Sequence, residues 1–92
     1  MSGQKIILTI SGKDKIGIVA SVSATLAQLK VNIEDIKQTI MQDHFVMVML
    51  CDISNSDKNF KEIKETIIND SAKLEMEAWI QKKEIFDKMH TI

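Results

Sequence analysis

Histidine and cysteine, which often catalyse reactions or bind metals, are scarce in this 92-residue chain. The only histidines, His44 and His90, are far apart in the sequence, and a metal site needs three or four ligands in register. Cys51 stands in an apolar run without a neighbouring histidine, so it is expected to be a small core residue rather than a nucleophile. Adjacent carboxylates such as Glu34 and Asp35 diverge when they lie on a strand. We therefore expect no enzyme activity, no bound metal and no cofactor.

The segment with the clearest capacity for binding is a loop flanked by glycines, Gly12-Lys13-Asp14-Lys15-Ile16-Gly17. Two glycines around charged residues interrupt the preceding strand-like sequence, which is typical of a loop. It is not a phosphate-binding P-loop, because Ile18 and Val19 stand where that motif needs Lys and Ser or Thr. From composition alone, a tight strand-to-helix turn without a ligand is the favoured interpretation.

Hydrophobic periodicity predicts the elements that hold this loop in place. Alternating or β-branched apolar residues indicate strands, and apolar residues three or four apart indicate helices. In chain order we expect a strand over 5–11, a helix from Ile18 to near Lys30, strands over 31–41 and 45–53, a helix marked by Phe60, Ile63 and Ile67 and ended by 69–71, a strand over 73–81 and a short helix over 84–90. This order predicts a single α+β domain over residues 1–92 with a ferredoxin-like βαββαβ fold. Its four-stranded antiparallel sheet carries two helices on one face, and a short C-terminal helix follows.

Two local features refine these boundaries. Ile33 and Ile36 fall on opposite faces of a regular strand, so we expect a bend or bulge near Asp35. Ser56 or Asp57, in a polar loop, is expected to cap the second main helix.

The last predicted strand alternates between two environments. Leu74, Met76, Ala78 and Ile80 are expected to point inward, while Trp79 points outward among polar neighbours. An outward tryptophan often marks a contact surface. Here it would serve either a subunit interface or packing under the C-terminal helix.

Composition excludes several classes of function. The net charge of −1 does not supply the positive field that nucleic-acid backbones require. The longest apolar run, Phe45 to Cys51, is far too short to cross a bilayer. The N-terminal residues lack the pattern of a signal peptide, and one cysteine cannot form an internal disulfide, so we expect a cytoplasmic protein.

Several motifs together resemble those of the ACT domain family. Residues 12–19 resemble the ACT loop, which typically reads Gly-x-Asp-Arg-Pro-Gly followed by two apolar residues, and residues 31–36 resemble its Asn-Ile signature. Residues 47–50, 52–54 and the tail 84–92 resemble a group of small stand-alone ACT proteins of bacteria and archaea, the uncharacterised UPF0237 group. The resemblance extends over essentially the whole chain.

The resemblance implies a ligand-binding site between two copies of the chain. ACT domains usually bind small molecules, most often amino acids, at such an interface. The loop before the first helix supplies backbone groups, and the start of the second strand of a partner supplies a side chain. By position, the implied ligand-binding residues are Gly12, Lys13, Asp14, Lys15, Ile16, Gly17 and Ile18 of one copy and Asn32 and Ile33 of the other.

Physical chemistry agrees with these implied roles. Gly17 allows the backbone to approach a ligand closely. The first amides of the helix, near Ile18, lack internal partners, so they are expected to receive a carboxylate with the help of the helix dipole. Asp14 would take an ammonium group, and Asn32 offers both a donor and an acceptor.

The chain departs from the family pattern at two positions. Ile16 stands where many ACT loops have proline, which predicts a less rigid loop. Lys30 stands where the family usually has a glycine that ends the helix, and this difference concerns structure more than ligand choice.

Two functions follow from the resemblance. The first is a regulatory sensor, a homodimer or larger homo-oligomer that binds an amino acid or similar metabolite and acts on a separate protein. The second is a protein-interaction module of the same fold without a small-molecule ligand. For His90 in the tail, packing or capping is favoured over a functional role.

Overall fold

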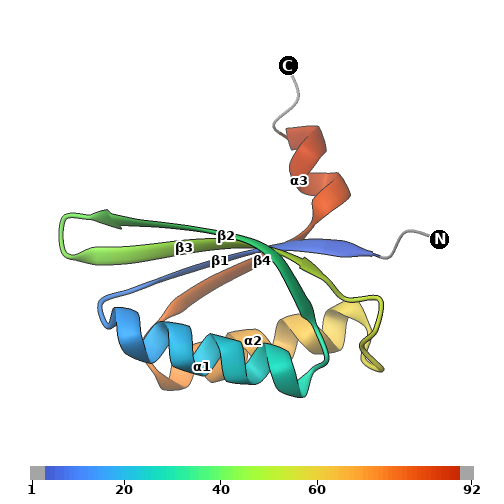
Figure 1. Cartoon of the computed structure of the whole chain (residues 1–92), viewed down its shortest axis with the longest axis horizontal. Coiled ribbons are helices and arrows are strands. Elements are labelled where there is room, and N and C mark those ends of the chain that lie inside the picture. Colours follow the sequence, from blue (N-terminus) through green and yellow to red (C-terminus); the bar gives the residue numbers. More distant parts are fainter. Residues whose placement is uncertain (1–3, 90–92) are drawn as a thin grey trace.

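A computed structural model of the chain describes residues 4–89, which form seven elements in the predicted order (Figure 1). The elements are β1 (Lys5–Gly12), α1 (Lys15–Gln28), β2 (Asn32–Met41), β3 (His44–Asp52), α2 (Phe60–Lys73), β4 (Glu77–Lys82) and α3 (Lys83–Met89). The ferredoxin-like prediction is therefore confirmed. His90 lies outside the described residues.

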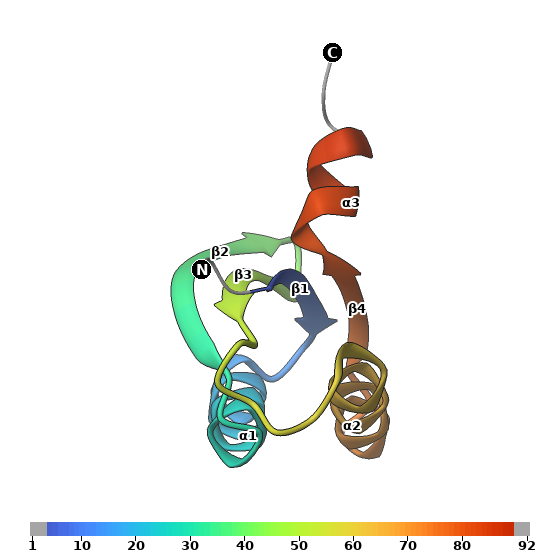
Figure 2. The same ribbon diagram turned by 90° about the vertical axis from the view of Figure 1, so that its right-hand side faces the viewer.

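The four strands form one antiparallel sheet in the order β2-β3-β1-β4. α1 lies under the β2–β3 half and α2 under the β4 half, so one face of the sheet is covered by helices (Figure 2). α3 projects from the end of β4 on the opposite side, which carries no helix layer (Figure 1). β2 and β4 are the two edges of the sheet.

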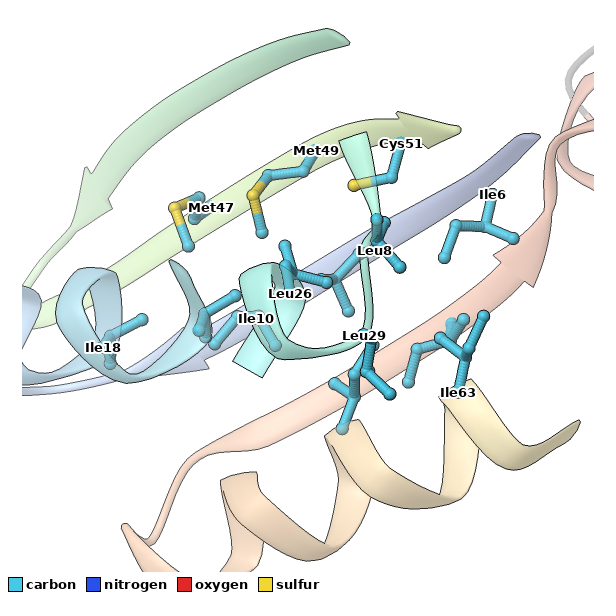
Figure 3. Close-up of a cluster of buried hydrophobic side chains, with 14 of the residues drawn as sticks. Ile6, Leu8, Ile10, Ile18, Leu26, Leu29, Met47, Met49, Cys51 and Ile63 are labelled. Carbon is cyan, nitrogen blue, oxygen red and sulfur yellow. The ribbon is translucent and has the colours of Figure 1, made fainter. Parts of the chain in front are cut away.

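The hydrophobic core fills the space between the sheet and its two helices (Figure 3). Alternate residues of the central strands β1 and β3 point into it, because successive side chains of a strand face opposite sides. The fully buried members come from β1 (Ile6, Leu8, Ile10), β3 (Met47, Met49, Cys51), α1 (Ile18, Leu26) and α2 (Ile63). Burying each of the larger of these side chains contributes about 1.5–3 kcal/mol.

α1 begins three residues earlier than the predicted start at Ile18. Its first residue is Lys15, and Asp14 is its N-cap. The periodicity missed this first turn because Ile16 is 82% exposed and gives no core signal. The ligand loop expected over residues 12–17 is thus reduced to Lys13 and Asp14 between β1 and α1.

α2 differs from its predicted bounds at both ends. Its cap is Asn59 rather than Ser56 or Asp57, because Asn59 and Glu62 form a reciprocal capping box. The helix continues past 69–71 to Lys73. Residues 73–76 are therefore helix end and turn rather than strand.

The turn after α2 overturns one of the inward predictions. Leu74 is 51% exposed, whereas Met76 and Ile80 are buried and Ala78 packs partly against the core. β4 begins only at Glu77.

Each main helix is followed, two positions after its last residue, by a residue in the left-handed backbone region. Lys30 has φ 59° and Glu75 has φ 58°. In each case the next residue closes the helix: the Val31 amide donates to the Leu26 carbonyl, and the Met76 amide donates to the Ser71 carbonyl. This is the hydrogen-bond pattern of a helix end that usually contains glycine at the left-handed position.

β2 is the exposed edge of the sheet along its entire length. Its register with β3 shifts between Ile33 and Asp35, which confirms the predicted bulge. Beyond the bulge, Ile36 and Ile40 share the helix side of the strand, opposite the buried Met49 and Phe45. Ile40 is nevertheless 66% exposed, because no element of residues 4–89 covers the outer edge of β2.

Candidate functional site

The junction of β1 and α1 is held by the side chain of Asp14. Its carboxylate oxygen Oδ1 accepts a hydrogen bond from the Gly17 amide at 3.0 Å, and its carbonyl accepts one from the Ile18 amide at 2.9 Å. Two of the amides that were expected to be free for a ligand are therefore used within the loop.

Gly17 is shaped by this cap rather than by an open space. A Cβ added at position 17 would lie 2.6 Å from Oδ2 of Asp14, closer than real contacts allow. Gly12 is similarly constrained, since a Cβ there would lie 2.8 Å from Cδ1 of Ile18. Both glycines thus permit close packing inside one subunit.

Two amides at the start of α1 remain available to a ligand. Among residues 4–89, the amides of Lys15 and Ile16 have no hydrogen-bond acceptor. They lie at the positive end of the helix dipole, which favours an anion. The Lys15 ammonium lies over the Phe45 ring, 5.7 Å from the centre of the ring.

An apolar hollow of about 330 Å³ lies against the first turns of α1 and is lined by Lys15, Ile16, Val19 and Ala20. It lies on the flank of α1 away from α2. Ile16 and Thr25 are nine positions apart, about two and a half turns, so they face opposite sides of the helix. Thr25 faces α2, where its hydroxyl donates to Asp70 at 2.9 Å.

On the other side of the loop lies a cleft of about 450 Å³ between the β1–α1 junction and the turn after α2. Its walls include Ser11, Lys13, Asp14, His44, Glu75 and Glu77. Charges of both signs are present, which suits a small zwitterion. The His44 ring contacts the Asp43 carboxylate at 3.2 Å, and this bond, aided by the nearby Lys13, lowers the pKa of Asp43.

The structure does not bring all the implied site residues together in one subunit. Gly12 to Ile18 cluster around the start of α1, as expected. Asn32 and Ile33 lie at the opposite end of the sheet, because β3 pairs Gly12 with Phe45 and Asn32 with Asp52. The site suggested by the resemblance is therefore divided between the two ends of the sheet.

The surroundings of Asn32 are polar and ordered by ion pairs. Lys5 donates to Glu34 at 2.7 Å, and this bond raises the pKa of Lys5. Asp52, the β3 partner of Asn32, accepts hydrogen bonds from the amide and the hydroxyl of Ser54, which lower its pKa.

Periodicity did not reveal the exposed apolar stripe of Ile33, Ile36 and Ile40 on β2. These residues resemble core positions in the sequence, and only the strand order shows that they lie on an uncovered edge. The signal that could have revealed them is the polar residue beside each isoleucine, which is unusual for a strand buried on both faces.

The sequence model of the ACT domain family matches residues 4–81. The chain belongs to the ACT domain family. A UPF0237 protein of Listeria innocua is 46% identical over 86 residues, which cover 94% of this chain and 97% of that protein. The proposed resemblance to this group is confirmed.

Solved structures agree on the fold. An ACT domain protein from Streptococcus pneumoniae has a TM-score of 0.81 and 33% identity, covering 99% of both chains. The ligand-free regulatory subunit of aspartate kinase from Thermus thermophilus has a TM-score of 0.65 and 20% identity, covering 85% of this chain and 50% of that chain. The latter likeness concerns the fold alone.

Other chemistry has little support in this ACT domain. Burial raises the pKa of the Cys51 thiol to about 11, so the thiolate is scarce at neutral pH. Within residues 4–89, no three His, Cys, Asp or Glu side chains are grouped to hold a metal ion. No helix in the same range is long and apolar enough to cross a membrane.

Proposed function

We propose that this ACT domain acts as a homodimeric sensor that binds an amino acid or a similar small zwitterion between two copies. The observation that carries the proposal is the division of the implied site: Asn32 and the start of α1 lie at opposite ends of one sheet. A two-fold pairing of two sheets along β2 would bring these two ends together.

The β2 edge is suited to such pairing. All ten of its residues are exposed, and an unpaired strand edge offers a row of free amides and carbonyls to another strand. Antiparallel pairing centred on Ile36 would place Asp35 of each copy opposite Lys37 of the other. The charges of the strand are therefore self-complementary, and the isoleucine stripe would be covered at the same time.

The same register would complete the ligand site. Because the bulge after Ile33 adds a residue to β2, Asn32 of one copy would lie beside Thr39 and Ile40 of the other, and Ile40 is the β3 partner of Phe45, which pairs with Gly12. Asn32 would thus reach the end of the sheet where α1 begins and where the apolar hollow of Ile16 and Val19 lies.

The chemistry of this site fits an α-amino acid. A ligand carboxylate would bind the amides of Lys15 and Ile16, and Asn32 of the partner subunit would add a hydrogen bond. The Asp14 carboxylate now caps α1 through the Gly17 amide, so a ligand ammonium that binds Asp14 would compete with this cap. Released from the cap, Asp14 would be positioned to bind the ligand ammonium.

Regulation would pass to a separate protein as a coupling free energy between ligand binding and partner binding, which acts in both directions. We further propose a cytoplasmic location, for which the single buried thiol is the supporting observation. The second candidate function is a protein-interaction module, which the broad exposed β2 edge would equally serve.

A thermal-shift screen of the chain against the standard amino acids tests the sensor. A ligand that binds only the native state stabilises it by about 2.7 kcal/mol at a hundredfold excess over its Kd. Asn32→Ala should abolish the shift without destabilising the fold, because Asn32 is exposed. Asn55→Ala is the matched control, because Asn55 is also exposed but lies in the loop between β3 and α2.

Two outcomes would count against this function. No shift with any amino acid would favour the interaction module. A full shift retained in Asn32→Ala would contradict a site shared between two copies.

A further inference from the structure

The face of the sheet opposite α1 and α2 has an apolar centre and no layer above it (Figure 1). By register, Val46, Val48 and Leu50 of β3 lie on this face beside Ile7 and Thr9 of β1. We call this surface the open face. Trp79 of β4, the only tryptophan of the chain, lies at its margin and is 52% exposed.

α3 forms a wall at one end of the open face. It stands away from the sheet, and its main contacts with other elements are on β1 and β4 (Figure 2). A helix of seven residues is about 10 Å tall, which is also about the distance between two stacked sheets. Its Met89 is 64% exposed, and so short a helix is not stable without packing partners. The wall formed by α3 is thus about as tall as the space that a second stacked sheet would occupy.

The margin of the open face carries charges of both signs at its two edges. Lys37 of β2, Val48, Thr9 and Trp79 of β4 lie on one line across the sheet. Glu77 lies on the same face of β4, two residues before Trp79. The β2 edge thus presents Lys37 beside Asp35, and the β4 edge presents Glu77 beside an aromatic ring.

We propose that the open face binds the open face of a second copy of this chain, related by a two-fold axis parallel to the strands. Such an axis exchanges the two edges, so Lys37 of each copy faces Trp79 and Glu77 of the other. An apolar centre with a charged margin of both signs is the usual anatomy of a protein interface.

This contact is separate from the β2 edge pairing and does not depend on it. Stacked sheets pack about 10 Å apart with their strands nearly aligned, while edge pairing extends a sheet sideways. The two contacts use different surfaces of the chain and can therefore coexist.

Sedimentation and Trp79 fluorescence test the stacking on the full chain. In the stack Trp79 is shielded, so its emission should shift to longer wavelength as dilution dissociates the copies. Glu77→Lys should weaken stacking at least tenfold by placing two cations together. Glu65→Lys, an exposed residue of α2 with the same charge change, should have no effect.

A variant of the β2 edge separates this proposal from the proposed function. Ile40→Asp lies on the helix side of β2, so it should disrupt edge pairing and leave stacked dimers with shielded Trp79. If the unmodified chain forms edge dimers but no stacked dimers, only the present proposal is overturned. The proposal is also overturned if Trp79 emission does not depend on protein concentration, or if Glu77→Lys does not change the mass found by sedimentation. In either case the open face is empty or binds a different protein.

Discussion

The Asp14 carboxylate accepts a hydrogen bond from the Gly17 amide at 3.0 Å, so α1 begins with an anion supplied by its own chain. The two residues depend on each other, because any side chain at position 17 would collide with that carboxylate. A ligand that uses the Gly17 amide or the Asp14 carboxylate must replace this interaction, whereas the amides of Lys15 and Ile16 have no acceptor to displace. The unliganded loop is therefore partly closed by its own cap.

This dependence predicts non-additive effects on stability. Asp14→Ala should cost about 1 kcal/mol of unfolding free energy through loss of the cap. Gly17→Ala in that background should gain up to about 1 kcal/mol from the better helix propensity of alanine. In the wild-type background the same substitution should gain nothing, because the new Cβ displaces the Asp14 carboxylate. Urea unfolding of the four proteins measures the coupling, and additive effects would contradict the close contact.

Asp14→Asn separates capping from ligand binding. Asparagine is an equally good N-cap but carries no charge. Unfolding free energy should therefore stay within a few tenths of a kcal/mol of wild type, while any amino-acid thermal shift is lost. A retained shift would show that the Asp14 charge has no part in binding.

The helix ends predict two stabilising substitutions. Lys30 and Glu75 have left-handed backbones that favour glycine, so Lys30→Gly and Glu75→Gly should each raise the unfolding free energy by about 0.5–1 kcal/mol. Lys30→Ala keeps the Cβ and should give no gain. A higher urea midpoint with an unchanged m value is the expected readout. Equal stability of the Gly and Ala variants would contradict backbone strain at this position.

Most of the fold was predictable from the sequence because the core signal is strong. Alternation along β1 and β3 and the helical spacing of residues such as Ile18, Ile63 and Ile67 correspond to buried positions. Even the bulge at Asp35 followed from isoleucines that a regular strand would place on opposite faces. These signals work because they reflect burial of apolar side chains.

The helix starts and the division of the site were not predictable in this way. The first turn of α1 and the cap at Asn59 depend on hydrogen bonds between side chain and backbone, which leave no apolar pattern. The position of Asn32 depends on strand order, which local periodicity does not contain. An edge strand such as β2 resembles a half-buried strand until its neighbours are known.

The corrected cap of α2 provides a matched pair of substitutions. Asn59→Ala should cost about 1 kcal/mol, since it removes a capping box in which Asn59 accepts from the Glu62 amide at 2.9 Å. Asp57→Ala, at the position first expected to cap the helix, should change the unfolding free energy little. Equal losses from both substitutions would contradict the capping box.

The buried thiol of Cys51 predicts a specific loss of stability in alkali. Burial raises its pKa from 9.0 to about 11, with a smaller contribution from Glu34. The folded state therefore binds the thiol proton more tightly than the unfolded state does. The stabilisation is complete below pH 9 and disappears as the pH rises toward 11, with a total of roughly 2 kcal/mol.

Cys51→Val isolates this contribution, because every other titratable group is common to both proteins. The difference in unfolding free energy between wild type and variant should be constant from pH 7 to about pH 9 and then move in favour of the variant. Labelling of the native thiol at neutral pH should be slow and should accelerate only with unfolding, since the side chain is fully buried. Rapid labelling of the folded protein, or a difference that does not change with pH, would place Cys51 in a more open environment than the core between β3 and α1.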